Sequence, residues 1–304
     1  MFDQSINGVI QRSYSLYVLP IVGVLTMISL SIGGRFLSSD EDFLEHFWRF
    51  GLSENLLMIL SIGLKMGVKF AIILMCAYHF RINVASFKNI LITVVMVVIC
   101  EFVISIISSF FFQFLSGFDI LFLIYMSIGV VSLLIQCAVY TLGFILVFKY
   151  AGSAFDVFEG SARKSPQYWR TANLITLFFM IHLMSSIMMS LYMAVGFNTI
   201  VLGNLGLMLL INALVALPLF VLVFSKKLNL QRLEIGTILR TGRFLGFWIV
   251  ILLIVCELLI NYLDSGSSIG GFIVLGLSLF ALYVVLIVTI TFVTVKKRFS
   301  ERAL

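Results

Sequence analysis

Long apolar runs separated by short polar segments dominate the sequence. Eight of these runs are close to or longer than the roughly 20 residues that a helix needs to cross the hydrocarbon core of a bilayer. The predicted fold is therefore an all-α polytopic membrane protein with about eight transmembrane helices, forming a single transmembrane domain over residues 1–304. The pattern predicts spans near residues 16–34, 55–78, 88–116, 119–148, 171–197, 199–224, 244–263 and 269–295.

The composition agrees with this pattern and excludes several classes of protein. Hydrophobic residues make up 62% of the chain and charged residues only 11%, whereas a soluble domain carries about 25% charged residues. A soluble enzyme, a disordered chain, a secreted disulfide scaffold and a nucleic-acid-binding domain are all inconsistent with these values. An even number of spans places both termini on one side, where 16 of the 20 lysines and arginines then lie. The positive-inside rule therefore predicts that both termini are cytoplasmic.

The chain divides without a gap into four segments of equal length, which predict four repeats of a helical hairpin. A basic residue recurs at the same position of each segment, at Arg12, Lys88, Lys164 and Arg240. Positive-inside bias alone would also produce such a column, so this alternative stays open. The predicted repeats are residues 1–76, 77–152, 153–228 and 229–304.

Polar segments ahead of the hairpins are predicted to be amphipathic helices on the cytoplasmic surface. Residues 152–168 and 225–243 have this character, with apolar positions on one face and basic residues on the other. Basic residues at this depth meet anionic lipid headgroups. The candidates for headgroup binding are Arg12, Lys88, Arg163, Lys164, Arg240 and Arg243.

Two of these segments resemble a known family. EGSARKSPQYWRTANL at 159–174 and IGTILRTGRFLGFW at 235–248 are similar to the basic, Trp- or Tyr-bearing segments of YciC-like bacterial inner-membrane proteins. They also resemble the membrane domains fused to some glycerophosphodiester phosphodiesterases. The resemblance covers about 30 residues in a degenerate motif and implies a non-enzymatic protein of the bacterial inner membrane, tied to lipid homeostasis.

Ionisable residues inside the predicted spans are the sharpest functional signal. Such a side chain costs about 2.5–3.5 kcal/mol at the centre of a bilayer on insertion scales, so it is usually paired or functional. Gly63 and Gly67 flank one of these residues at a spacing that permits close helix approach. The predicted spans place most of these groups at a similar depth. The predicted charged layer consists of Lys65, Lys69, Glu101, His182 and Glu257.

Three interpretations of this charged layer remain open. In the first interpretation, the charges only pair with one another and fix the register of the helices. Glu101 and Glu257 are alternatively carriers in a proton- or ion-coupled pathway. In the third interpretation, Lys65 and Lys69 hold an anionic headgroup.

Catalytic and cofactor-binding motifs are missing from the sequence. It contains no P-loop, no H-E-x-x-H, no G-x-S-x-G elbow and no C-x-x-C pair among its four cysteines. We therefore predict no enzyme activity, no metal, no cofactor and no nucleic-acid partner, and the oligomeric state stays open. The preferred function is a non-catalytic inner-membrane protein that engages lipids or a partner membrane complex. The alternative is an ion-coupled secondary transporter or permease subunit that uses the charged layer, and an intramembrane enzyme ranks third.

Overall fold

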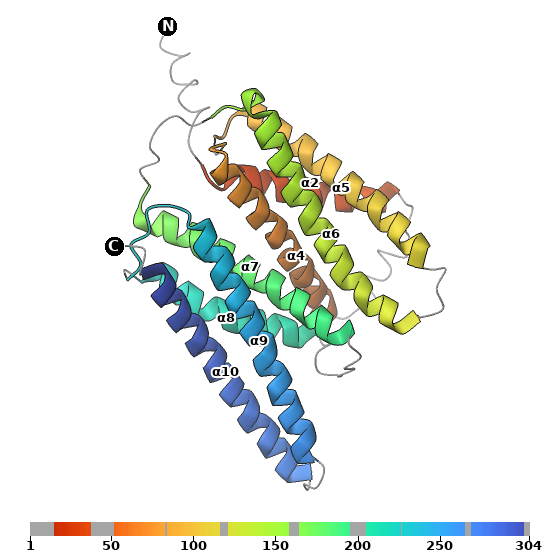
Figure 1. Cartoon of the computed structure of the whole chain (residues 1–304), viewed down its shortest axis with the longest axis vertical. Helices are drawn as coiled ribbons and strands as arrows, with labels where there is room; N and C mark the ends of the chain where they lie inside the picture. The colour runs from red at the N-terminus through yellow and green to blue at the C-terminus, as the bar shows by residue number, and fades with distance from the viewer. Residues whose placement is uncertain are drawn as a thin grey trace. The chain divides into compact units, whose positions relative to one another are not determined.

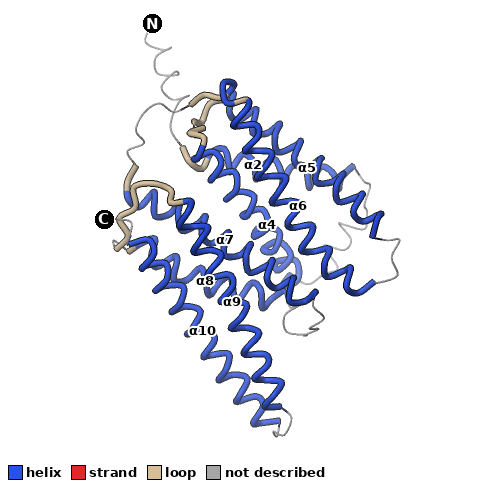
Figure 2. Tube along the Cα trace, viewed as in Figure 1, coloured by secondary structure: helices blue, strands red, loops and turns tan. Residues whose placement is uncertain are grey.

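The computed structural model describes residues 15–37, 52–82, 84–115, 121–157, 164–194, 205–225, 227–264 and 269–300. Every secondary-structure element in these ranges is a helix (Figures 1 and 2). Contacts between residues divide the chain into two compact units, unit 1 over Met1–Arg163 and unit 2 over Lys164–Leu304. Each unit is described separately below.

Four long helices form unit 1. α2 (Val18–Leu37) and α4 (Leu52–His79) pack together, as do α5 (Phe87–Leu115) and α6 (Leu121–Tyr150). α2 also packs on α5, and α4 on α6, so the four helices form a closed ring. A short 3₁₀ turn, η1 (Gly152–Ala154), follows α6. α4 ends, α5 begins and α6 ends beside Arg81, Lys88 and Lys149, so we call this the basic end and the opposite one the far end.

Unit 2 has the same order of neighbours. α7 (Pro166–Ala194) packs on α8 (Leu205–Phe224) and α9 (Ile235–Asp264), and α10 (Ile269–Ser300) packs on the same two helices. Matched in chain order, each helix of unit 2 therefore has the same two neighbours as its counterpart in unit 1. The basic end of unit 2 carries Lys164 before α7 and Lys297 and Arg298 in the last turn of α10.

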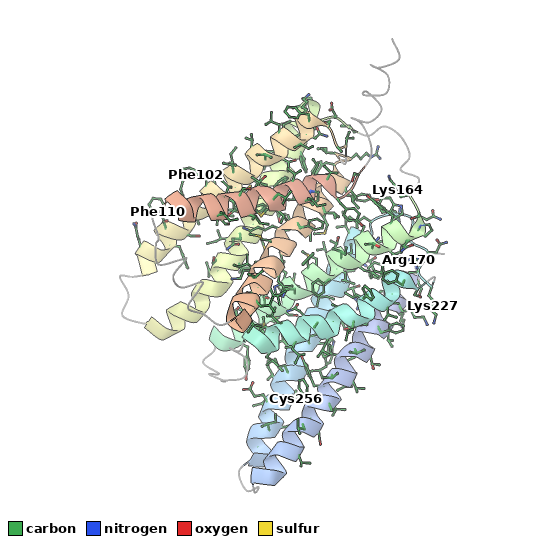
Figure 3. All side chains as sticks on the ribbon, turned by 180° about the vertical axis from the view of Figure 1, so that it is seen from behind. Phe102, Phe110, Lys164, Arg170, Lys227 and Cys256 are labelled. Atoms are coloured by element: carbon green, nitrogen blue, oxygen red, sulfur yellow. The ribbon has the colours of Figure 1, made fainter. Side chains whose placement is uncertain are left out.

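The helices have the character of membrane spans. Seven of them are long and apolar enough to cross a bilayer, and the apolar part of α2, Val18–Ile32, is shorter. Large apolar side chains lie on the outside of the bundles, including Phe102 and Phe110 of α5, which are 66% and 70% exposed (Figure 3). Such surfaces are typical of contact with lipid. An all-helical membrane protein, as predicted, is confirmed at this level.

Two predicted surface helices are wrong within the described residues. Residues 235–243, predicted to lie on the membrane surface, are the first turns of α9, and residues 227–234 are not helical. The segment 152–168 is not one helix either, because η1 ends at Ala154 and α7 begins at Pro166. Ser165 accepts a hydrogen bond from the Tyr168 N–H at 3.3 Å, so a serine cap followed by proline in the first position starts the helix there.

Glycines set the contact between α7 and α9. A Cβ atom added to Gly246 would lie 2.5 Å from Met184 Cβ, and one added to Gly242 would lie 3.0 Å from Met180 Cβ. For Gly63, one of the two glycines at which the sequence predicted a close approach, nothing in the described part of the chain lies within 4 Å of the position of its Cβ. The small-residue spacing is therefore used in unit 2, by a pair of glycines that the sequence analysis did not single out.

A fully buried asparagine fastens a loop at the basic end of each unit. In unit 2, Asn173 donates from Nδ2 to the Arg232 carbonyl at 2.8 Å and accepts from the Glu234 N–H at 2.8 Å. In unit 1, Asn89 donates to the Asp156 carbonyl at 3.0 Å and accepts from the Asp156 N–H at 2.9 Å. Each amide side chain supplies a donor and an acceptor to backbone groups of the loop, and in unit 2 the Glu234 N–H is buried.

We expect Asn173→Ala to lower the free energy of unfolding by about 2 kcal/mol, because it leaves the buried Glu234 N–H unpaired and removes the hydrogen bond to the Arg232 carbonyl. Thr171→Ala on the same helix is the matched control. Its hydroxyl only donates to the Gln167 carbonyl at an exposed position, so a change within about 0.5 kcal/mol is expected. Denaturant titration of the purified protein in detergent measures both. Equal losses in the two variants would contradict this role of Asn173.

Candidate functional site

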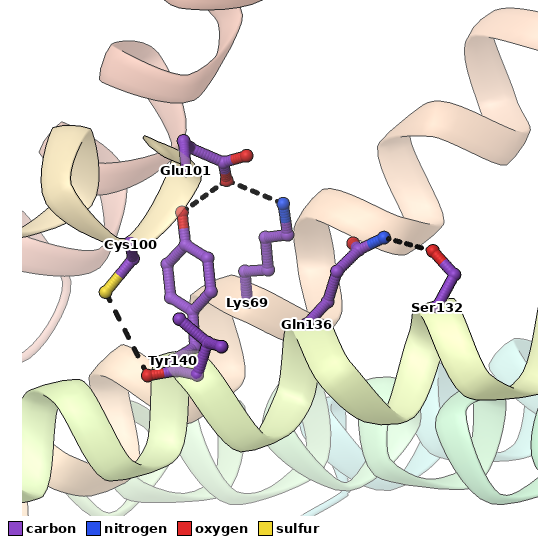
Figure 4. Close-up of polar contacts among 7 residues, drawn as sticks. Lys69, Cys100, Glu101, Ser132, Gln136 and Tyr140 are labelled. Atoms are coloured by element: carbon purple, nitrogen blue, oxygen red, sulfur yellow. Dashed lines mark hydrogen bonds and ion pairs between the residues drawn. The ribbon is translucent and has the colours of Figure 1, made fainter. Parts of the chain in front are cut away.

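A partly buried cluster of charged side chains lies in unit 1. Lys69 Nζ of α4 lies 2.7 Å from Glu101 Oε1 of α5 (Figure 4). Tyr140 of α6 donates from its hydroxyl to the same oxygen at 2.5 Å, and the Lys69 ammonium lies 5.0 Å from the centre of its ring. The side chains of Lys69 and Glu101 are 14% and 28% exposed. The cluster therefore joins three helices through one ion pair and one charge-assisted hydrogen bond.

The structure pairs Glu101 with Lys69, although the sequence left two lysines as candidates. Lys65 lies one turn earlier on α4 and is exposed, and within the described part of the chain it forms no ion pair with Glu101. One ion pair in unit 1, Lys69–Glu101, is therefore consistent with the interpretation that the charges pair with one another.

His182 and Glu257 are buried inside unit 2. His182 Nδ1 of α7 lies 3.1 Å from Asn212 Oδ1 of α8, and Glu257 of α9 is 6% exposed. Glu257 is the twenty-third residue of its helix and Glu101 the fifteenth of α5, a difference of about 12 Å in helix rise. The sequence predicted that Glu101 and Glu257 lie equally far from the starts of their helices. They do not, because α9 begins at Ile235, nine residues before the predicted span. Among the described residues no group of three His, Cys, Asp or Glu side chains could hold a metal ion.

A pocket of about 730 Å³ lies at the basic end of unit 2, and we call it the arginine pocket. Its basic residues are Arg240 and Arg243 of α9 and Arg298 of α10, and Phe244 and Phe247 form an apolar part of its wall. Arg298 lies 4.6 Å from the centre of the Phe244 ring and donates from Nη1 to the Arg240 carbonyl at 3.0 Å. These two contacts hold the Arg298 guanidinium group beside the pocket.

Two threonines complete the lining of the arginine pocket. Thr237 and Thr241 are 5% and 0% exposed, and their hydroxyls make no hydrogen bond within the described part of the chain. Together with Arg240 and Phe244 they lie at intervals of three and four residues, along one face of α9. The concavity therefore offers positive charge and aromatic surface, and the two buried threonines form part of the wall behind it.

The structure places the lipid-binding candidates from the sequence at different locations. Arg240 and Arg243 line the arginine pocket. Lys88, in the first turn of α5, and Lys164, before α7, are exposed and do not line it. Arg12 and Arg163 lie outside the described residues.

Arg298 belongs to this site and was not a candidate in the sequence analysis. It is 55 residues from Arg243, and the antiparallel packing of α9 and α10 brings the two together. The sequence did contain a signal for this residue. The last turn of the final span is basic, and that span runs back to the end of the bundle at which the preceding span begins.

No family model, curated protein or solved structure matches the chain.

Proposed function

We propose that this protein is a non-catalytic integral membrane protein that binds the phosphate of an anionic phospholipid in the arginine pocket. The observation that carries the proposal is the convergence of Arg240, Arg243 and Arg298 on one cavity at the basic end of α9 and α10. Guanidinium groups bind phosphate through paired N–H donors, so three of them form a favourable site for an anionic headgroup.

The shape of the pocket also fits a lipid better than a free ion. Phe244 and Phe247 place aromatic surface beside the arginines, and their neighbours on α9 continue into an apolar span. A headgroup held by the arginines would leave its acyl chains along this apolar surface. Basic pockets at the ends of membrane helices commonly bind anionic headgroups in this way.

We further infer that the basic end faces the cytoplasm of a bacterial inner membrane. Support comes from the excess of lysine and arginine at the ends of the helices and from the resemblance of residues 159–174 and 235–248 to YciC-like proteins. The equal order of helix neighbours in the two units supports an origin by internal repetition, with helical hairpins as the repeated element.

The test is lipid binding to the purified protein in neutral detergent, counted by native mass spectrometry with phosphatidylglycerol and with phosphatidylcholine. Replacing Arg240, Arg243 and Arg298 together by glutamine should weaken phosphatidylglycerol binding by more than about tenfold, since each arginine near a headgroup contributes roughly 1 kcal/mol. Phosphatidylcholine binding should change little.

Lys297→Gln is the matched control, because Lys297 neighbours Arg298 in the last turn of α10 but does not line the pocket. It should change phosphatidylglycerol binding by less than about twofold. If Lys297→Gln and Arg298→Gln weaken binding equally, the effect belongs to the general positive charge of this end and the arginine pocket is not the site.

A further inference from the structure

Two stripes of polar side chains run along neighbouring helices of unit 1. On α4, Ser61, Lys65 and Lys69 follow one another at intervals of four residues. On α6, Ser132, Gln136 and Tyr140 do the same. This spacing keeps each set near one face of its helix. Both stripes lie inside candidate membrane spans that are largely apolar.

The helices α4 and α6 pack together and run in the same direction, and the contact between Lys69 and Tyr140 places their two stripes side by side. Lys69 contacts Tyr140, and further toward the basic end the rings of Phe80 and Phe148 lie 5.9 Å apart. One turn toward the far end therefore brings Lys65 level with Gln136. Gln136 donates to the Ser132 hydroxyl at 3.2 Å, which continues the polar line along α6 (Figure 4).

Toward the basic end, the two polar stripes end at the Lys69–Glu101 ion pair. Lys69 and Glu101 neutralise one another at 2.7 Å, so the exposed Lys65 leaves the line with one net positive charge. A lysine within a membrane span usually faces protein, a partner charge or a water-filled cavity. Lysine side chains that line a hydrated passage favour anions over cations.

We propose that the two stripes border a hydrated path that opens at the far end of unit 1, stops at the Lys69–Glu101 pair and admits small inorganic anions. Lys65 supplies the attraction, and Ser132 and Gln136 offer hydrogen bonds to the water and to the ion. The path concerns unit 1 and does not depend on lipid binding at the arginine pocket in unit 2.

Single cysteines test the path in the full-length protein. Cys137 and Cys256, which are partly exposed, are replaced by alanine, while the buried Cys76 and Cys100 remain. Gln136→Cys then reports on the path, and Leu134→Cys, at nearly the same depth but 46% exposed on another face of α6, is the matched control. The probes are two membrane-impermeant methanethiosulfonates, one with a sulfonate and one with a quaternary ammonium group, added to intact cells and to inverted membrane vesicles.

From the side of the far end, Gln136→Cys should react at least about tenfold faster than Leu134→Cys, because the thiolate that reacts forms only in water. The rate of the sulfonate reagent relative to the ammonium reagent should exceed the ratio for a free thiol. Adding Lys65→Gln should lower this ratio by about tenfold, which is the effect of one unit charge about 6 Å away in water on two reagents of opposite sign.

Equally slow reaction at both cysteines, in protein that elutes and melts like its parent, would overturn the path. Fast reaction at Gln136→Cys with a reagent ratio that Lys65→Gln leaves unchanged would overturn its preference for anions. If Gln136→Cys does not fold, Ser132→Cys serves as a second reporter, since it exchanges a hydroxyl for a thiol of similar size on the same stripe.

Discussion

Replacing Lys69 by glutamine is expected to lower the free energy of unfolding by about 3 kcal/mol, the lower part of the range for breaking a buried ion pair. Glu101 would keep its hydrogen bond from the Tyr140 hydroxyl but lose the ammonium 2.7 Å away. We place the expected loss in the lower part of the range because Glu101 keeps the hydrogen bond from Tyr140 and its side chain is 28% exposed rather than fully buried.

Lys65→Gln is the control for this experiment. It removes the same kind of side chain from the same helix, one turn away and at an exposed position, so a change within about 0.5 kcal/mol is expected. The pair of variants separates the loss of the ion pair from the loss of a positive charge on α4. Unfolding in mixed micelles, followed by loss of helical circular dichroism, gives the two free energies.

Glu101→Gln combined with Lys69→Gln completes a double-mutant cycle. Because neither charge is then left buried alone, the double variant should be more stable than the sum of the two single losses predicts, by about 1 kcal/mol or more. Additive losses within about 0.3–0.5 kcal/mol would show that the two side chains do not interact in the folded protein.

Gly246→Val is expected to lower the free energy of unfolding by about 3 kcal/mol or more, because it overpacks the contact between α7 and α9. A Cβ at this position would lie 3.0 Å from the Ser185 backbone nitrogen as well as 2.5 Å from Met184 Cβ. Backbone atoms cannot be relieved by a change of rotamer, so the two helices would have to separate.

Gly276→Ala in α10 is the matched control, since nothing lies within 4 Å of the position of its Cβ. Alanine has the higher helix propensity there, so the free energy of unfolding should stay the same or rise by up to about 1 kcal/mol. The same micellar unfolding experiment measures both glycine variants. A tolerated Gly246→Val would mean that α7 and α9 are not in close contact at this point.

The boundaries of the helices show what hydropathy alone can predict. The spans expected at 88–116 and 119–148 lie within two residues of α5 and α6, because apolar residues fill these helices nearly to their ends. The start of α9 was missed by nine residues. Its first turns carry Arg240 and Arg243 and so fail any test of apolar character, although nothing in their sequence ends a helix.

Charged residues could be identified from the sequence, but their partners could not. Lys65 and Lys69 occupy the same face of α4 by spacing, and only the rotation of α4 against α5 decides which of them meets Glu101. Likewise, Gly63–Gly67 and Gly242–Gly246 have the same spacing, yet only the second pair is known to border a helix contact. Which face of a helix is covered depends on packing between segments that are distant in the sequence.

The order of helix contacts has a consequence for biosynthesis. Within the described ranges, α2, α4, α5 and α6 each pack on two other helices of the first unit, which ends at Arg163. The first half of the chain therefore has all its packing partners once α6 has been inserted, while the ribosome is still translating the second half. Within each unit, the first helix packs on the second and the third. Its contacts are therefore complete only after the third helix, α5 or α9, has been inserted. We therefore expect each unit to assemble as a separate step during membrane insertion, and each step is completed only after the third helix of that unit has been inserted.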